Sequence, residues 1–192
     1  MKLIEEIIKS FIILFVIMDP FASLPVFISI TRGFKPQNVA KSANKAVLVA
    51  GALAVLFILL GKPILDVLRI SVSDIQIAGG IILGIMGLDL VLGISLVKER
   101  VKDYNVAAVV IGTPLLTGPG VIAASILLVQ EQGFLAPLVA AVISLFFIWI
   151  VLRNAHRLQK FFGINFIDVV SRIMGILLTA IAIGFIRAGV TG

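Results

Sequence analysis

Two short polar segments interrupt long apolar runs of this sequence, and their residues match position by position. Residues 19–25 read DPFASLP, and residues 113–120 read TPLLTGPG. A spacing of 94 residues aligns three pairs: Pro20 with Pro114, Ser23 with Thr117, and Pro25 with Pro119. Proline has no N–H group and clashes with the carbonyl four residues earlier, so a helix that carries two nearby prolines is expected to open there. The freed backbone groups and the side chains beside them could bind a small polar molecule through hydrogen bonds.

These interruptions indicate a binding site inside a membrane rather than a catalytic centre. An opened backbone in hydrocarbon is tolerated only where protein or a water-lined cavity satisfies it. Interrupted spans at corresponding places in two halves of a chain are typical of the substrate sites of transporters. The predicted substrate-binding residues are Asp19, Pro20, Ser23, Thr113, Thr117, Gly118 and Gly120. Glycine allows close backbone approach because it lacks Cβ, while the alternative for Ser23 and Thr117 is that they merely cap the second half-helices.

Two carboxylates are predicted to lie deep in the apolar runs. Asp19 follows about 16 residues of the first run, which measure roughly 24 Å as a helix. An ionisable group at that depth is a candidate functional residue, because charge in hydrocarbon is costly. Asp19 could bind an ammonium group, a cation or a transported proton, or it could simply satisfy the break. Asp89 is the second coupling or cavity-lining candidate and would either pair with Arg172 or face the cavity, although Arg172 also has Asp168 one helical turn away.

The elements that must position these residues are membrane-spanning helices. About 20 helical residues cross a hydrocarbon core roughly 30 Å thick. Six apolar stretches are long enough: residues 3–31, 42–61, 74–97, 104–130, 134–152 and 166–189. The first and fourth are too long for one straight span, so each is predicted to be two half-helices joined by non-helical residues. Residues 62–73 are predicted to form a surface connector, with Pro63 starting a brief interfacial helix.

Composition places the chain among integral membrane proteins and excludes several kinds of chemistry. Of its 192 residues, 60% are hydrophobic and only 14% are charged, far from the average of soluble domains. The absence of cysteine excludes disulfides, thiolate catalysis and cysteine-bound metal, and a single histidine makes a metal site unexpected. No cofactor is predicted. The net charge of +6 suits anionic lipid headgroups rather than nucleic acid, because the basic residues lie in short loops beside apolar spans.

Charge and repeat patterns together predict the topology. Most Lys and Arg residues follow the first, third and fifth spans, so the positive-inside rule places these loops in the cytoplasm of a multi-pass cell-membrane protein, with both termini outside. Residues 1–100 and 101–192 each contain three spans, so the second repeat must be inverted within one membrane domain. Gly80-Ile81-Ile82-Leu83 also resembles Gly175-Ile176-Leu177-Leu178, although small-residue helix packing explains that match equally well.

Three segments resemble the MarC family of six-span membrane proteins. They are residues 18–31 (MDPFASLPVFISIT), 112–122 (GTPLLTGPGVI) and 171–183 (SRIMGILLTAIAI). The resemblance extends over nearly the whole chain, and it departs from the usual family pattern at Asp19, where Asn is common. It implies a secondary transporter of small neutral amino acids such as glycine and alanine, driven by a proton or sodium gradient and acting by alternating access.

A zwitterionic substrate needs acceptors for its ammonium group and donors for its carboxylate. The second half-helices, expected to start near Pro25 and Pro119, would present N–H groups and positive dipole ends to the carboxylate. Carbonyls freed upstream of Pro20 and Pro114 would face the ammonium group. Both requirements are therefore met by the two predicted breaks.

Two other functions compete with the transporter. A passive channel or an exporter of small polar solutes would also use broken helices, since selectivity filters are built from them. An intramembrane aspartyl protease would use Asp19 and Asp89 as an acid–base pair. The sequence disfavours the protease, because Gly87-Leu88-Asp89 lacks a further glycine and no tyrosine precedes Asp19. The chain is therefore not expected to be an enzyme, and its oligomeric state does not follow from the sequence.

Overall fold

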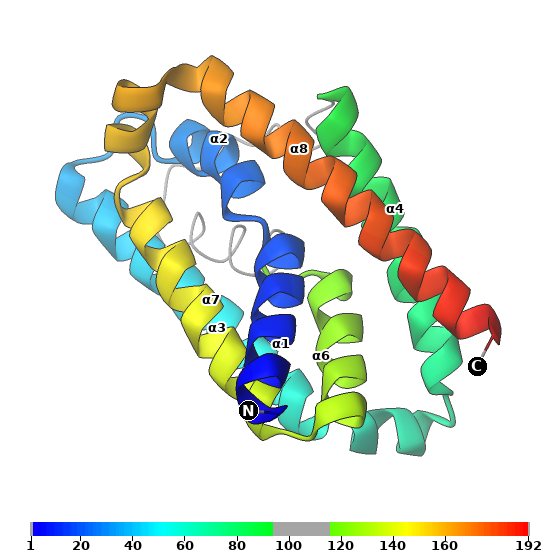
Figure 1. The fold of residues 1–192 in the computed structure, drawn as a ribbon. Helices are drawn as coiled ribbons and strands as arrows, with labels where there is room; N and C mark the ends of the chain where they lie inside the picture. Colours follow the sequence, from blue (N-terminus) through cyan, green and yellow to red (C-terminus); the bar gives the residue numbers. More distant parts are fainter. Residues whose placement is uncertain (1, 94–115, 192) are drawn as a thin grey trace.

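The computed structural model describes residues 2–93 and 116–191, and all regular structure within these ranges is helical. The helices, shown in Figure 1, are α1 (Lys2–Met18), α2 (Pro20–Ile30), α3 (Pro36–Leu68), α4 (Val72–Leu92), α6 (Pro119–Gln132), α7 (Leu135–Arg153) and α8 (Ala155–Thr191). Long α3, α4, α7 and α8 form the sides of the bundle, and α1 and α6 lie inside it. The all-helical fold class predicted from the sequence is therefore confirmed for the described residues.

The outer surface of the bundle is apolar. Five segments of the described chain are long and apolar enough to cross a membrane: Lys2–Ile30, which joins α1 and α2, and the helices α3, α4, α7 and α8. Leu48, Val67 and Val190 face outward with 73%, 83% and 72% of their surface exposed. Soluble proteins rarely expose so much contiguous apolar surface, so the chain is a multi-pass integral membrane protein.

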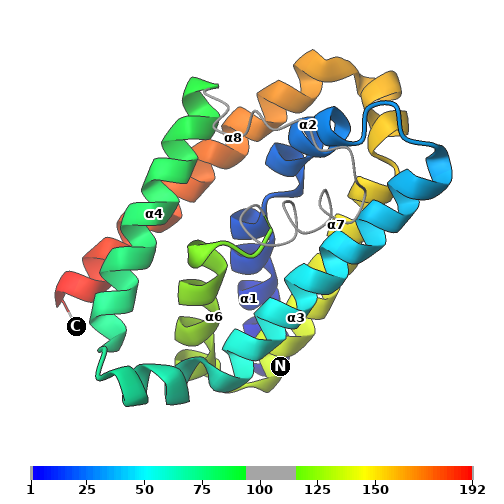
Figure 2. The same ribbon diagram turned by 180° about the vertical axis from the view of Figure 1, so that it is seen from behind.

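The described helices coincide with five of the six predicted spans, and α6 covers the second part of the run at 104–130. The prediction of a separate connector helix starting at Pro63 is wrong, because α3 continues through this residue to Leu68. Gly61 and Leu65 are buried on either side of Pro63, so tertiary packing keeps the helix continuous despite the missing N–H group. Figure 2 shows the last turns of α3 bending across the lower end of the bundle.

Helices α4 and α8 pack against each other through small residues. Three close approaches define the interface: Gly80 with Ala182, Gly87 with Gly175, and Gly189 with Ser73. Positions along α8 fall as positions along α4 rise, so the two helices are antiparallel. Gly87 and Gly175 lie so close that a Cβ on either would stand 2.8 Å from the carbonyl oxygen of the other. Such backbone contact is typical of helix pairs in membranes, where small residues replace the hydrophobic effect as the source of association.

Helix α1 is held inside the bundle by contacts with α6 and α7. The Lys9 Nζ donates to Glu131 Oε2 at 2.7 Å, and Ser10 Oγ donates to Gln132 Oε1 at 2.7 Å. On the other side, the ring of Phe11 lies 5.9 Å from that of Phe147 on α7. These contacts fix the middle of α1. Its last turn is buried, at Leu14, Val16, Ile17 and Met18, and Asp19 follows it directly.

Candidate functional site

The first polar segment of the sequence lies at the junction of α1 and α2. Helix α1 ends at Met18, and Asp19 has the left-handed backbone angles φ 32° and ψ 82°, which are uncommon outside glycine. Its Oδ1 accepts hydrogen bonds from the N–H groups of Phe21 at 3.1 Å and Ala22 at 3.0 Å. Pro20 is the first residue of α2, where its missing N–H costs no helical hydrogen bond. Asp19 is therefore the N-cap of α2.

The expectation that a half-helix starts near Pro25 is wrong, and so is the alternative that Ser23 caps such a helix. Helix α2 already begins at Pro20, and Pro25 lies inside it. The Ser23 Oγ is buried and donates to the carbonyl of Asp19 at 3.0 Å, within the first turn of α2. Aspartate is one of the best N-capping residues, and here its side chain occupies the first N–H groups of α2. Those groups are consequently not free to bind a substrate carboxylate in this conformation.

The second carboxylate oxygen of Asp19 has no hydrogen-bond partner among the described residues. Asp19 is only 4% exposed, and its Oδ2 is fully buried. A buried polar atom without a partner is costly, and native proteins leave few of them. Asp19 Oδ2 is therefore an unused acceptor in the interior of the bundle, oriented by the two backbone hydrogen bonds that its sister oxygen accepts.

The second polar segment leads into α6, which begins at Pro119. The Thr117 hydroxyl is buried and donates to the carbonyl of Ala50 on α3 at 3.1 Å, so this threonine joins two helices rather than capping one. Gly118 is the N-cap residue, with extended backbone and no side-chain cap. Within the described residues no side chain caps the N-terminus of α6, in contrast to that of α2. Pro119 has no N–H, the Val121 N–H donates to the Gly118 carbonyl at 3.0 Å, and the Gly120 N–H has no described partner. Thr113 and Pro114 lie outside the described residues.

Close packing surrounds Gly120 in the first turn of α6. A Cβ at this position would overlap the side chain of Leu83 on α4 and would lie 3.2 Å from Cγ2 of Ile17 on α1. The glycine therefore allows three helices to meet. Because Ile17 precedes Asp19 by two residues, this contact also brings the end of α1 to the start of α6, as both ribbon views show (Figures 1 and 2).

Comparison with known proteins identifies the family. The family model described as "MarC family integral membrane protein" matches residues 4–192. The chain belongs to the MarC family. It is 31% identical to a UPF0056 membrane protein of Archaeoglobus fulgidus over 191 residues, which cover 94% of this chain and 90% of the relative. It is 32% identical to a UPF0056 membrane protein of Methanocaldococcus jannaschii, with 98% of both chains covered. No solved structure matches the chain.

The second predicted carboxylate of this MarC protein is on α4. Asp89 is half-buried, and within residues 2–93 and 116–191 it forms no ion pair with Arg172. Arg172 is exposed, and one of its guanidinium nitrogens lies next to Gly93, where α4 ends. The described contacts therefore do not join Asp89 to Asp19, and they do not place Arg172 in an ion pair with Asp168.

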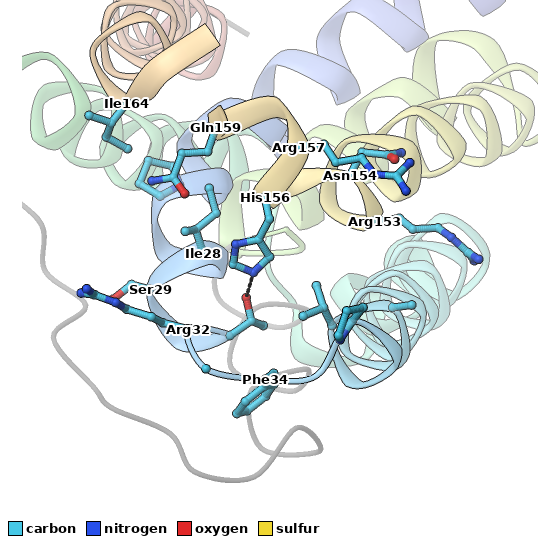
Figure 3. Close-up of a pocket in the computed structure, with 16 residues that line it drawn as sticks. Ile28, Ser29, Arg32, Phe34, Arg153, Asn154, His156, Arg157, Gln159 and Ile164 are labelled. Atoms are coloured by element: carbon cyan, nitrogen blue, oxygen red, sulfur yellow. Dashed lines mark hydrogen bonds between the residues drawn. The ribbon is translucent and has the colours of Figure 1, made fainter. Parts of the chain in front are cut away.

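A cavity of about 1,170 Å³ opens at another place in the MarC chain, where α2, the start of α3 and the α7–α8 connection meet (Figure 3). None of the described substrate-binding candidates lines it. Arg32, Arg153, His156 and Arg157 do, and His156 Nε2 lies 3.2 Å from Thr31 Oγ1. Since the Thr31 hydroxyl already donates to the carbonyl of Phe27 at 2.7 Å, His156 Nε2 is the donor to Thr31. In the sequence, this cavity was indicated only by the basic residues that follow the predicted spans.

Proposed function

We propose that this MarC protein is a secondary transporter of small neutral amino acids of the glycine and alanine class, which works by alternating access. The substrate would bind between Asp19 and the start of α6. The observation that carries the proposal is the buried Oδ2 of Asp19, which has no partner among the described residues and lies where α1 meets the uncapped end of α6.

The two ends of this site suit the two charges of an amino acid. The substrate ammonium group would donate to Asp19 Oδ2, an acceptor that is already desolvated and oriented. The substrate carboxylate would approach the N–H of Gly120 at the start of α6, where the helix dipole is positive and no described side chain caps the backbone. Gly118 has no Cβ, so a ligand could come close to this backbone.

A preference for small side chains follows from the packing around the start of α6. Leu83 and Ile17 already contact Gly120, and they would limit a substrate side chain to about the size of a methyl group. Ser23 and Thr117 donate their protons to backbone carbonyls. In this conformation we assign to both hydroxyls a structural role, which is to stabilise the backbone where the helices start. Each hydroxyl oxygen keeps a lone pair that could accept a hydrogen bond from a substrate donor.

Two helix pairs support an inverted repeat, an arrangement that many alternating-access transporters use. Gly51 of α3 faces Leu145 of α7, and these residues are 94 apart, so exchanging the two halves returns the same contact. On the other side of the bundle, Gly80 faces Ala182, and Gly87 faces Gly175. A spacing of 95 exchanges these two contacts. Contacts that map onto themselves are what a two-fold axis between the halves would produce.

The proposed orientation rests on the position of charge. Helix α1 begins and α8 ends at one end of the bundle, while Arg32 and Arg157 lie at the other (Figures 1 and 3). The positive-inside rule would put the arginines in the cytoplasm and both chain ends outside the cell membrane. Asp19 is the proposed site of proton or sodium coupling, and Asp89 is a second candidate for it.

Binding and counterflow test the proposal together. Purified protein is titrated calorimetrically with glycine, alanine, serine and leucine, and proteoliposomes loaded with unlabelled alanine are supplied with labelled alanine. We expect binding of the three small amino acids, weak or absent binding of leucine, and saturable counterflow. Large flux that does not saturate would identify a passive channel instead. Absence of binding and of counterflow for all four amino acids would reject the proposed substrate class.

A further inference from the structure

The connection between α7 and α8 carries two neighbouring cavities that share Asn154 and Arg157. The larger one, described above, reaches toward α2 and α3. The smaller one has a volume of about 620 Å³, and its further lining residues are Leu158, Lys160, Phe161 and Phe162. One surface therefore joins a polar, basic hollow to an apolar one, and Asn154 and Arg157 lie at the boundary.

The basic side chains of this surface have no acidic partner among the described residues. Neither cavity is lined by Asp or Glu, and Arg153, Arg157 and Lys160 form no described ion pair. Asn154 and Arg157 line both cavities, and in Figure 3 the Arg153 side chain extends from the end of α7 toward α3. Guanidinium groups match the oxygens of a phosphate through parallel N–H bonds. The charge of this surface is thus suited to an anion that bears a phosphate.

Arg153 is oriented by an aromatic ring. Its guanidinium carbon lies 5.0 Å above the ring centre of Trp149, and the Trp149 N–H is held by Asn44 Oδ1 at 2.7 Å. At this distance the contact is a cation–π interaction, and Arg153 has no ion-pair partner among the described residues. Tryptophan at the end of a membrane helix is also typical of the headgroup level of a bilayer.

Exposed phenylalanines adjoin the basic group and select among phosphate-bearing ligands. Phe161 is 82% exposed, and its ring centre lies 4.9 Å from that of Phe162, which in turn lies 5.0 Å from that of Phe166. A water-soluble phosphate would gain nothing from three aromatic rings, whereas acyl chains would bury them. The combination of cationic and apolar surface therefore favours a phospholipid.

We propose that Arg153, Asn154, Arg157 and Lys160, together with Phe161 and Phe162, form a binding site for one anionic phospholipid. The lipid phosphate lies between Arg153 and Arg157, and the acyl chains run along the phenylalanines. The site is in the cytoplasmic leaflet if the charge-based orientation is right. This proposal does not depend on the transported substrate, because none of these residues belongs to the amino-acid site.

The chain contains its own reporter for this site. Trp149 is the single tryptophan of the sequence, and it lies against Arg153. Purified full-length protein in neutral detergent is titrated with phosphatidylglycerol that carries brominated acyl chains, with brominated phosphatidylcholine as the neutral comparison, and tryptophan fluorescence is followed. We expect quenching by the anionic lipid at a concentration at least about 25-fold lower than by the neutral one, because Arg157 and Lys160 each contribute about fivefold.

The variants Arg157→Gln and Lys160→Gln leave the Trp149–Arg153 pair intact. Each is expected to weaken phosphatidylglycerol about fivefold and to leave phosphatidylcholine unchanged. The matched control is Lys62→Gln with Arg187→Gln, two exposed cations at the other end of the bundle, and this double variant should bind as the natural protein does. Arg157→Lys keeps the charge but loses the planar guanidinium group that can bind two phosphate oxygens at once. Its affinity for phosphatidylglycerol should lie between that of the natural protein and that of Arg157→Gln.

Three results would overturn the proposal. The first is equal quenching by the two lipids in the natural protein. The second is a loss of selectivity in the control variant that equals the loss in Arg157→Gln. The third is competition by inorganic phosphate at the concentration at which the lipid binds, which would assign the basic group to a free anion instead of a lipid.

Discussion

The two polar segments that precede α2 and α6 start a helix by different chemistry. Before α2, an aspartate in left-handed conformation caps the first N–H groups with one oxygen and leaves the other oxygen without a described partner. Before α6, a glycine occupies the capping position and provides no side chain, while the neighbouring threonine bonds to α3. The two segments therefore supply opposite electrostatic ends, a buried acceptor at Asp19 and the uncapped N–H of Gly120 at the start of α6. That difference is what a zwitterion requires.

Gly120 gives the largest expected effect, because Leu83 occupies the position that a Cβ on this glycine would take. In Gly120→Ala the new Cβ would overlap Leu83, and overpacking of this kind costs about 1–3 kcal/mol. We expect a clearly lower midpoint of thermal unfolding in detergent, measured by intrinsic fluorescence. The matched control is Gly184→Ala on α8, where nothing lies within 4 Å of the added carbon. Equal midpoints for the two variants would contradict the described packing.

Two substitutions at Asp19 distinguish its role as the N-cap of α2 from its proposed role in substrate binding. Asp19→Asn keeps one oxygen for the N–H groups of Phe21 and Ala22 but removes the charge, so stability should change little. Alanine affinity should fall by roughly 10- to 150-fold, the equivalent of a charge-assisted hydrogen bond worth about 1.5–3 kcal/mol. Asp19→Ala should lose the same affinity and also about 1 kcal/mol of stability, since the cap is gone. Calorimetric titration and thermal unfolding measure the two quantities, with exposed Asp66→Asn as the control for loss of one acidic charge.

The sequence predicts the start of α2 more readily than it predicts the contacts of the segment before α6. An aspartate followed by proline is the usual start of a helix, since the first caps and the second needs no donor. The start of α2 at Pro20 could therefore have been predicted from Asp19 and Pro20. The argument that two nearby prolines open a helix instead placed this start near Pro25, five residues too late. The Thr117 bond to Ala50 joins residues 67 positions apart, and no local pattern reports such a contact. The same holds for Thr31 and His156, 125 positions apart.

The long helices were predictable as elements but not in their full extent. The long apolar runs predicted the membrane spans, because a helix needs about 20 mostly apolar residues to cross the hydrocarbon core. Helix α3 passes through Pro63 because Gly61 packs against Ile126 of α6, which is a tertiary contact that overrides local propensity. The basic residues that line the larger cavity could be recognised in the sequence as charges, yet their meeting brings together Arg32 and Arg157, which are 125 positions apart.

The two hydroxyls should differ in their effect on stability. Thr117→Val leaves the buried Ala50 carbonyl without the threonine donor and should cost about 1–3 kcal/mol, while Thr117→Ser should restore most of it. Ser23→Ala should cost about 0.5 kcal/mol or less, because the Asp19 carbonyl still accepts the Ser23 backbone N–H at 3.2 Å. Unfolding in a denaturing detergent series measures both. A larger loss for Ser23→Ala than for Thr117→Val would reverse the assigned roles.

The smallest effect is expected where α1 is fastened to α6 at the surface. Lys9 and Glu131 form an ion pair at 2.7 Å, with more than half of each side chain exposed. Exposed pairs contribute about 0.2–1 kcal/mol and are screened by salt. Lys9→Gln should therefore lower the unfolding midpoint slightly at low ionic strength and leave it unchanged in concentrated salt. A salt-independent loss would mean that the lysine stabilises α1 by packing.

An experimental structure of the protein with alanine bound would test directly whether the substrate binds between Asp19 and the start of α6. The account predicts the alanine nitrogen within about 3.2 Å of Asp19 Oδ2, with the carboxylate at the backbone of Gly118 and Gly120. Alanine found at the cavity between Arg32 and Arg157, or anywhere that leaves Asp19 Oδ2 without contact to it, would contradict the account.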